Sequence, residues 1–129
     1  MAVRAVKSIH PSVIFHIARK SEWDAAVTAG AYAADSLHTE GFIHCSTLQQ
    51  VIATADRLFG GRRDLVLLSI ATDRIQAEIR HENLEGGENL FPHIYGDFAP
   101  DAVIAVHDFQ PRDDGSFDLP QGLGSDAIA

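Results

Sequence analysis

Several stretches of the chain have the apolar pattern of β-strands. Residues 13–17 are mostly β-branched and aromatic, and residues 42–46 alternate between two faces. Residues 65–70 form a continuous apolar run, which predicts a central strand buried on both faces. Residues 77–82 and 102–106 predict two later strands, and a strand-like segment, 91–96, lies between them.

Two segments have helical spacing instead. Trp23, Ala26 and Val27 share one face of a helix predicted over 22–29, with Ser21 as N-cap and Gly30 just past its end. The second helix has six apolar positions at helical spacing, Leu48, Val51, Ile52, Ala55, Leu58 and Phe59. Ser46 or Thr47 is expected to cap it.

The order of these elements predicts the fold class. Both helices come early and most strands come late, so strict strand–helix alternation fails after residue 60. We therefore expect a small single α+β domain with a mixed β-sheet and two main helices. The domain is expected over 13–120, with a flexible lead-in over 1–12 and a flexible tail over 121–129. Phe117 is expected to open a short edge strand.

Composition narrows the class of protein. The 129 residues are 46% hydrophobic and 22% charged, which is typical of a globular domain, and the formal net charge is −8. This acidic balance argues against nucleic-acid or anionic-membrane partners. No apolar run is long enough for a membrane span, the N-terminus lacks the apolar core of a signal peptide, and a single cysteine suits a reducing compartment. We expect a cytoplasmic protein.

Strand alternation restricts the chemistry of the segment 42–46. His44 and Ser46 share one face of the predicted strand with Phe42, whereas Cys45 lies on the other face. His44 therefore cannot activate Cys45, and Cys45 is expected to be a small buried hydrophobe. His44-Cys45-Ser46 also fits the His-x-Ser/Thr element of two-histidine phosphoesterases, but those enzymes need two copies and this chain has one.

Histidines are the strongest candidates for a site. His16, His44 and His93 lie in strand-like segments, with Ser46 and Tyr95 nearby. Neutral histidine can orient a ligand or move a proton, although a buried histidine can equally well bond to the backbone. Glu40 and Glu82 are the carboxylates of most interest. A metal site would have to gather ligands from separate segments, because no local ligand pair exists, and we expect none; its candidate ligands are His16, His44, His81, His93 and Glu82.

The chain resembles the DUF952 family, small bacterial proteins of unknown function. The most specific matching segments are Glu40-Gly41-Phe42-Ile43-His44-Cys45-Ser46-Thr47 and Phe91-Pro92-His93-Ile94-Tyr95-Gly96. Further matches are Ile14-Phe15-His16-Ile17, Trp23, Gly30-Ala31-Tyr32, Ser36-Leu37, Asp64-Leu65-Val66-Leu67-Leu68, Glu82 and Gly115-Ser116-Phe117.

This resemblance implies a fold similar to the ADP-ribosyltransferase-like superfamily, whose members handle NAD or a related ribosyl group in a cleft between two small β-sheets. By that likeness the sheet is split, His16 binds a ribose, Ser46 or Thr47 supplies a hydroxyl, and Glu82 is the acid. Tyr32 or Tyr95 would stack on nicotinamide. Ile17-Ala18 stand where the superfamily usually has Gly-Thr.

Three hypotheses follow for this chain. The first is a small-molecule pocket in which Glu82 and His44 are catalytic and the ligand is bound by His16, Tyr32, Ser46, Thr47, His93 and Tyr95. NAD is then the candidate substrate of ribosyl transfer or glycohydrolysis, with no metal or resident cofactor implied. The second is a non-catalytic module that binds a ligand or another protein. The third is a structural role, in which the histidines and Tyr95 join the two sheets and loss of His44 costs about 1–3 kcal/mol.

Overall fold

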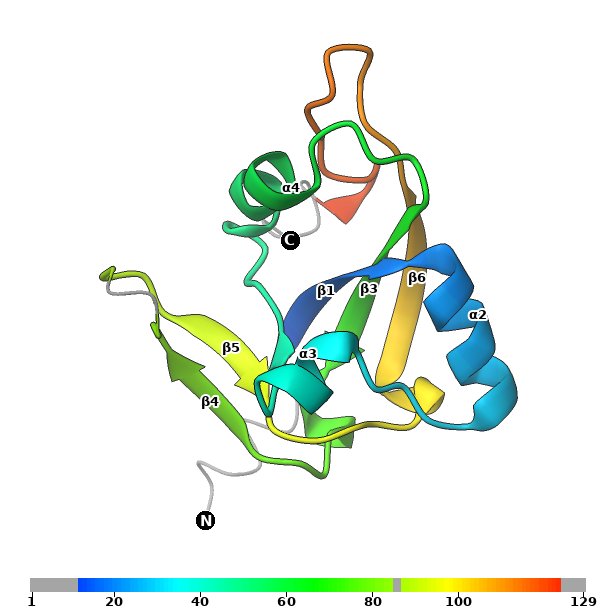
Figure 1. Ribbon diagram of the computed structural model, residues 1–129, viewed down its shortest axis with the longest axis vertical. Helices are drawn as coiled ribbons and strands as arrows, with labels where there is room; N and C mark the ends of the chain where they lie inside the picture. The colour runs from blue at the N-terminus through cyan, green and yellow to red at the C-terminus, as the bar shows by residue number, and fades with distance from the viewer. Residues whose placement is uncertain (1–11, 85–86, 124–129) are drawn as a thin grey trace.

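The computed structural model describes residues 12–84 and 87–123, which form two three-stranded antiparallel sheets (Figure 1). The first sheet has the order β1-β3-β6, comprising β1 (Val13–Arg19), β3 (Leu65–Ala71) and β6 (Val103–Phe109). The second has the order β2-β5-β4, comprising β2 (Ile43–His44), β5 (Phe91–Ile94) and β4 (Ile79–Glu82). The predicted lead-in and tail lie largely outside the described residues.

The α+β class is confirmed, but the predicted mixed sheet is wrong. Every pair of described strands is antiparallel. Strand–helix alternation in the first half of the chain suggested parallel pairing. However, β2 joins the other sheet, although it lies between β1 and β3 in sequence. β1 and β3 are therefore direct neighbours, and they pair in antiparallel orientation.

The described helices are α2 (Lys20–Ala29), α3 (Asp35–Thr39) and α4 (Val51–Phe59), with 3₁₀ turns η1 (Thr72–Arg74) and η2 (Pro100–Ala102). Helix α2 begins at Lys20, so Ser21 is not its N-cap, whereas Gly30 ends it at φ 85° as predicted. Helix α4 begins at Val51 with Gln50 as its N-cap, so neither Ser46 nor Thr47 caps it. In the turn before the helix, the Gln50 side chain accepts a hydrogen bond from the Thr47 N–H (3.0 Å). None of the described helices is long and apolar enough to cross a bilayer.

Two strand predictions need correction. The strand expected over 42–46 shrinks to β2 with an isolated bridge at Ser46, because the chain leaves the second sheet there to reach β1. Phe117 is not in a strand; its ring stacks on Phe109, with centroids 4.7 Å apart. The two rings are buried together, so Phe117 is held by packing rather than by sheet pairing.

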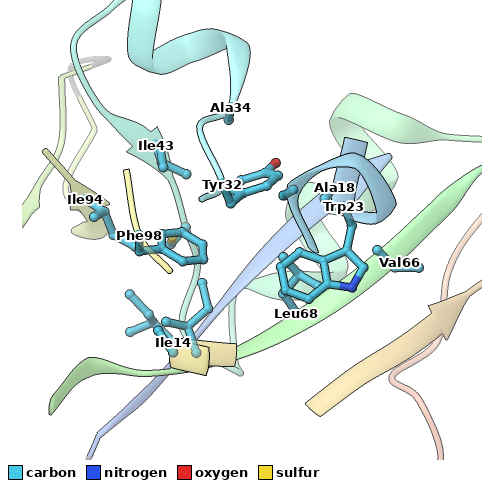
Figure 2. Packing of buried hydrophobic residues seen from close by; sticks show 14 residues of the cluster. Ile14, Ala18, Trp23, Tyr32, Ala34, Ile43, Val66, Leu68, Ile94 and Phe98 are labelled. Atoms are coloured by element: carbon cyan, nitrogen blue, oxygen red, sulfur yellow. The ribbon is translucent and has the colours of Figure 1, made fainter. Parts of the chain in front are cut away.

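Alternate residues of the first sheet build two cores. One face, with Ile14, Val66 and Leu68, packs against Trp23 of α2 and the inner face of the second sheet (Figure 2). The opposite face packs against α4. This division explains why all seven residues of β3 are buried, as expected for a central strand. Cys45 is buried in the first core, as predicted.

The two sheets meet along the edges of β1 and β2, where the backbone ladder stops after one rung. Phe15 and Ser46 exchange two backbone hydrogen bonds (2.8 and 2.7 Å). In an antiparallel ladder the next such pair would be Ile17 with His44. The His16 ring takes that place: its Nδ1–H donates to the His44 carbonyl (2.6 Å), and its Nε2 accepts from the Tyr32 hydroxyl (2.8 Å). We call this arrangement the seam.

Replacing His16 with alanine removes the partner of two buried groups in the seam, the His44 carbonyl and the Tyr32 hydroxyl. Unsatisfied buried polar groups are costly, so we expect the free energy of unfolding to fall by about 1–3 kcal/mol. His44 itself is exposed, so a His44→Ala variant should lose less than about 1 kcal/mol. Urea denaturation of both variants tests this assignment, and equal losses would contradict it.

The seam also predicts acid sensitivity. Burial lowers the pKa of His16 from 6.5 to about 4, so the folded protein holds this ring neutral. The unfolded chain binds more protons between these two values, and the free energy of unfolding should therefore decrease as pH falls from 6.5 to 4. The full contribution is about 3 kcal/mol. Proton NMR titration of the His16 ring measures the shift directly, and a midpoint near 6.5 would refute the prediction.

Candidate functional site

A pocket of about 510 Å³ opens beside the seam, where the edges of β1 and β2 part. Its walls come from β1, the segment 40–46, α4 and the β4–β5 hairpin. The volume lies in the range of small-molecule sites. Its lining includes Phe15, His16, Arg19, Glu22, Tyr32, Asp35, Glu40, Phe42, His44, Ser46, Arg57, Leu58, Phe59, Glu82, Leu84, Phe91 and His93.

Six of the eight predicted site residues line this pocket, namely His16, Tyr32, His44, Ser46, Glu82 and His93. Thr47 and Tyr95 are not part of its wall. Thr47 lies in the turn before α4, and Tyr95 lies behind Glu82 and contacts it through its hydroxyl. His44 and Glu82, predicted as the catalytic pair, each bond to a different partner.

Strand register places the polar face of the second sheet toward the pocket. Arg80, His93 and His44 form one row across β4, β5 and β2, and Glu82 pairs with Phe91 in the next row of the same face. The alternate residues Ile79, Ile94 and Ile43 point into the core instead. This is the alternation expected from the sequence for 42–46, extended to two more strands.

Glu82 is fixed by two hydrogen bonds to the same oxygen. Its Oε1 accepts one from His93 Nδ1 (3.0 Å) and a short one from the Tyr95 hydroxyl. The bonds from Tyr95 and then His93 lower the pKa of the Glu82 carboxyl below its ordinary value, so the group is ionised at neutral pH. Among the described residues no partner bonds to Oε2, which leaves this atom for a ligand.

A second histidine–carboxylate pair lies at the pocket rim. His44 Nε2 contacts both oxygens of Glu40 at 3.2 Å, and both side chains are about half exposed. The buried Phe42 ring joins the two pairs: it stacks on His93 at a centroid distance of 4.2 Å and meets His44 edge-on at 4.9 Å. The imidazoles of His44 and His93 are 5.3 Å apart.

His16 and Tyr32 are buried, unlike the rim pair His44 and Glu40, and they form a hydrogen bond with each other. Both nitrogens of His16 are engaged in the seam, so no ring nitrogen is left for a ribose. Tyr32 is 2% exposed because its ring packs against Trp23 and Phe98. A nicotinamide ring therefore cannot stack on Tyr32 without displacing these neighbours. Burial also raises the pKa of the Tyr32 hydroxyl, which stays protonated and donates to His16.

The mouth of the pocket is both charged and apolar. Arg19 lies 3.3 Å from Glu22 and 3.5 Å from Asp35, and Arg57 of α4 also lines the pocket. Leu58 of α4 and Leu84 at the end of β4 are each more than half exposed. A ligand would therefore meet both guanidinium and carboxylate groups here, together with apolar surface.

The histidines and carboxylates of this region meet in pairs, and the cysteine is buried. Within residues 12–84 and 87–123 no three side chains of His, Cys, Asp or Glu are placed to hold a metal ion. His81 in particular points to the opposite face of β4 from Glu82. Burial raises the pKa of the Cys45 thiol, so its reactive thiolate form is disfavoured.

Sequence reasoning missed part of the pocket wall. Phe42 was placed on the correct face, but its stacking on His93 needs the register between β2 and β5. Arg57 was overlooked because it lies on the polar side of an amphipathic helix, where a cation is ordinary. Glu40 was of interest from the sequence, but its contact with His44, four residues later, was not predicted because Glu40 lies outside β2.

Comparison with known proteins supports the DUF952 part of the resemblance seen in the sequence. No curated protein matches the chain. The crystal structure of protein CC0527 from Caulobacter crescentus is similar, with a TM-score of 0.77 and 29% identity over 92% of this chain and 100% of that one. The solution NMR structure of CC0527 gives a TM-score of 0.73 and 32% identity over 91% and 98%. The model of the DUF952 family, proteins of unknown function, matches residues 17–106, from β1 into β6, and the chain therefore belongs to this family.

Proposed function

We propose that the pocket binds NAD or a related ribosyl compound and that the protein cleaves or transfers its ribosyl group. The observation that carries this proposal is the Glu82 carboxylate in the pocket wall, ionised and held at Oε1, with no partner on Oε2 among the described residues. The location of the pocket, between two small sheets, agrees with the likeness to the ADP-ribosyltransferase-like superfamily.

A fixed carboxylate suits this chemistry. As the bond between C1′ of the ribose and the nicotinamide nitrogen breaks, its electron pair leaves with nicotinamide and positive charge develops on the sugar. A preorganised anion stabilises that charge because it needs no reorganisation during the reaction. Glu82 Oε2 would accept a hydrogen bond from a ribose hydroxyl and lie near the developing cation.

The other walls would bind the rest of the molecule. Arg19 and Arg57 are the cations that would contact a pyrophosphate, Arg19 by exchanging its ion pairs with Glu22 and Asp35. Leu58, Phe59 and Leu84 offer apolar surface to a base. His44, oriented by Glu40, would hydrogen-bond a hydroxyl group of the ligand at the rim. A free buried cysteine is consistent with action in the reducing cytoplasm.

A non-catalytic binding module is the second candidate function. The observation that favours it is the satisfied polar interior: among the described residues every buried side-chain nitrogen and oxygen has a hydrogen-bond partner. Two buried polar residues of the pocket wall, His16 and Tyr32, form a hydrogen bond with each other, so neither needs a ligand as its partner. Such a module would bind the same ligand without releasing a product.

Binding is expected to raise the melting temperature. A ligand present at about 100 times its Kd adds about 2.7 kcal/mol to the free energy of unfolding, which corresponds to several degrees for a domain of this size. Thermal denaturation with NAD, with ADP-ribose and with coenzyme A, which has an adenosine diphosphate portion but no second ribose, tests the proposal. The absence of any shift at millimolar NAD and ADP-ribose would reject it.

Glu82→Gln should separate binding from turnover. The amide keeps the shape of the side chain but removes the charge, so release of nicotinamide from NAD should fall about 100-fold or more while the Kd changes less than about threefold. Glu88→Gln is the matched control, because Glu88 is exposed and does not line the pocket. Binding of NAD without nicotinamide release by the unmodified protein would favour the non-catalytic module.

A further inference from the structure

The hydrogen bonds around His93 define its protonation pattern. His93 is buried, and its Nδ1 lies 3.0 Å from Glu82 Oε1. An ionised carboxylate only accepts hydrogen bonds, so Nδ1 carries the ring proton. In the neutral imidazole the lone pair is then on Nε2. This is the relation by which a carboxylate fixes the tautomer of a histidine base.

The surroundings leave Nε2 facing the pocket. Among the described residues the His93 ring bonds only to Glu82, while no buried side-chain nitrogen there lacks a partner. Nε2 is therefore not sealed in the protein interior, and His93 is part of the pocket wall. Phe42, stacked on the ring at an interplanar angle of 18°, restricts its rotation.

We infer that His93 is the general base of this pocket, with Glu82 and Tyr95 as the groups that position it. This inference deepens the proposed function and assigns a step to His93 rather than to His44. The His93 Nε2 lone pair takes a proton from water as the water oxygen bonds to C1′ of the ribose. Nicotinamide leaves with the electron pair of its broken bond, and the proton on Nε2 passes to solvent.

Comparison of the two histidine–carboxylate pairs supports this choice. The side chains of His93 and Glu82 are 6% and 22% exposed, whereas those of His44 and Glu40 are 46% and 51% exposed. Water competes for the hydrogen bonds between His44 and Glu40, so both of these side chains can rotate. Tyr95 further fixes Glu82, and Arg80 covers the Tyr95 ring at 4.4 Å. Only the first pair is therefore held in one geometry before a ligand binds.

The tautomer of His93 tests the inference without any need for activity. Long-range ¹H–¹⁵N correlation spectra of the protein labelled with ¹⁵N-histidine report which ring nitrogen bears the proton. We expect His93 to carry it on Nδ1 at neutral pH, and both tautomers to appear in Glu82→Ala. Glu40→Ala is the matched control, since it removes the carboxylate of the other pair and should leave the His93 signals unchanged. A proton on Nε2 in the unmodified protein would overturn the inference.

Kinetics supply the second test if nicotinamide release is observed. His93→Asn should lower kcat about 100-fold or more, the usual contribution of a general base, with KM changed less than about threefold. Tyr95→Phe should lower kcat by less, because Glu82 still orients the ring. Full activity of His93→Asn would overturn the inference and leave the proposed function standing. Failure of NAD to bind would reject the proposed function. The NMR spectra would still show, independently of NAD, whether Glu82 fixes the tautomer of His93.

Discussion

The arrangement of the whole molecule depends on one missing rung of backbone pairing. After the bridge between Phe15 and Ser46, the His16 side chain satisfies the carbonyl that the next rung would have used. An imidazole ring between two strands holds them farther apart than a direct backbone hydrogen bond does. The edges of β1 and β2 can therefore separate while the His44 carbonyl keeps a hydrogen-bond partner. The sheet is therefore split into two, and the pocket occupies the space beside the split.

The polar residues of this region fall into two groups according to whether a hydrogen-bonding atom remains open. His16 and Tyr32 have their partners within the protein, and together they hold the frame. Glu82 and His93 have one atom engaged and another facing the pocket. Structural and ligand-binding roles were alternatives for His16, His44 and His93 in the sequence, and the hydrogen bonds favour the structural role for His16 over the exposed His44. The ligand-binding role that we propose falls on Glu82 and His93.

The sequence could predict the features that depend on local pattern. The continuous apolar run gave β3, and alternation placed Cys45 in the core and His44 with Ser46 on the other face. It could not predict that β2 belongs to the second sheet rather than the first, because a strand of two residues has almost no pattern of apolar and polar positions. Helix α3 was missed for the same reason, since five residues show no helical period. The burial of Tyr32 depends on Trp23 and Phe98, which are distant in the chain.

The contact of Glu82 with His93 depends on register, which explains why residue types alone could not reveal it. Glu82 faces the pocket only because Ile79, three residues earlier, pairs with Ile94 in the core, and Ile94 pairs in turn with Ile43. A slip of one residue in β4 would bury Glu82 and expose the isoleucine, so the apolar face fixes the register of the polar face. The same alternation that stabilises the second sheet thus positions its candidate chemistry. Substitutions on the pocket face can therefore change ligand binding while the isoleucine row still specifies the fold.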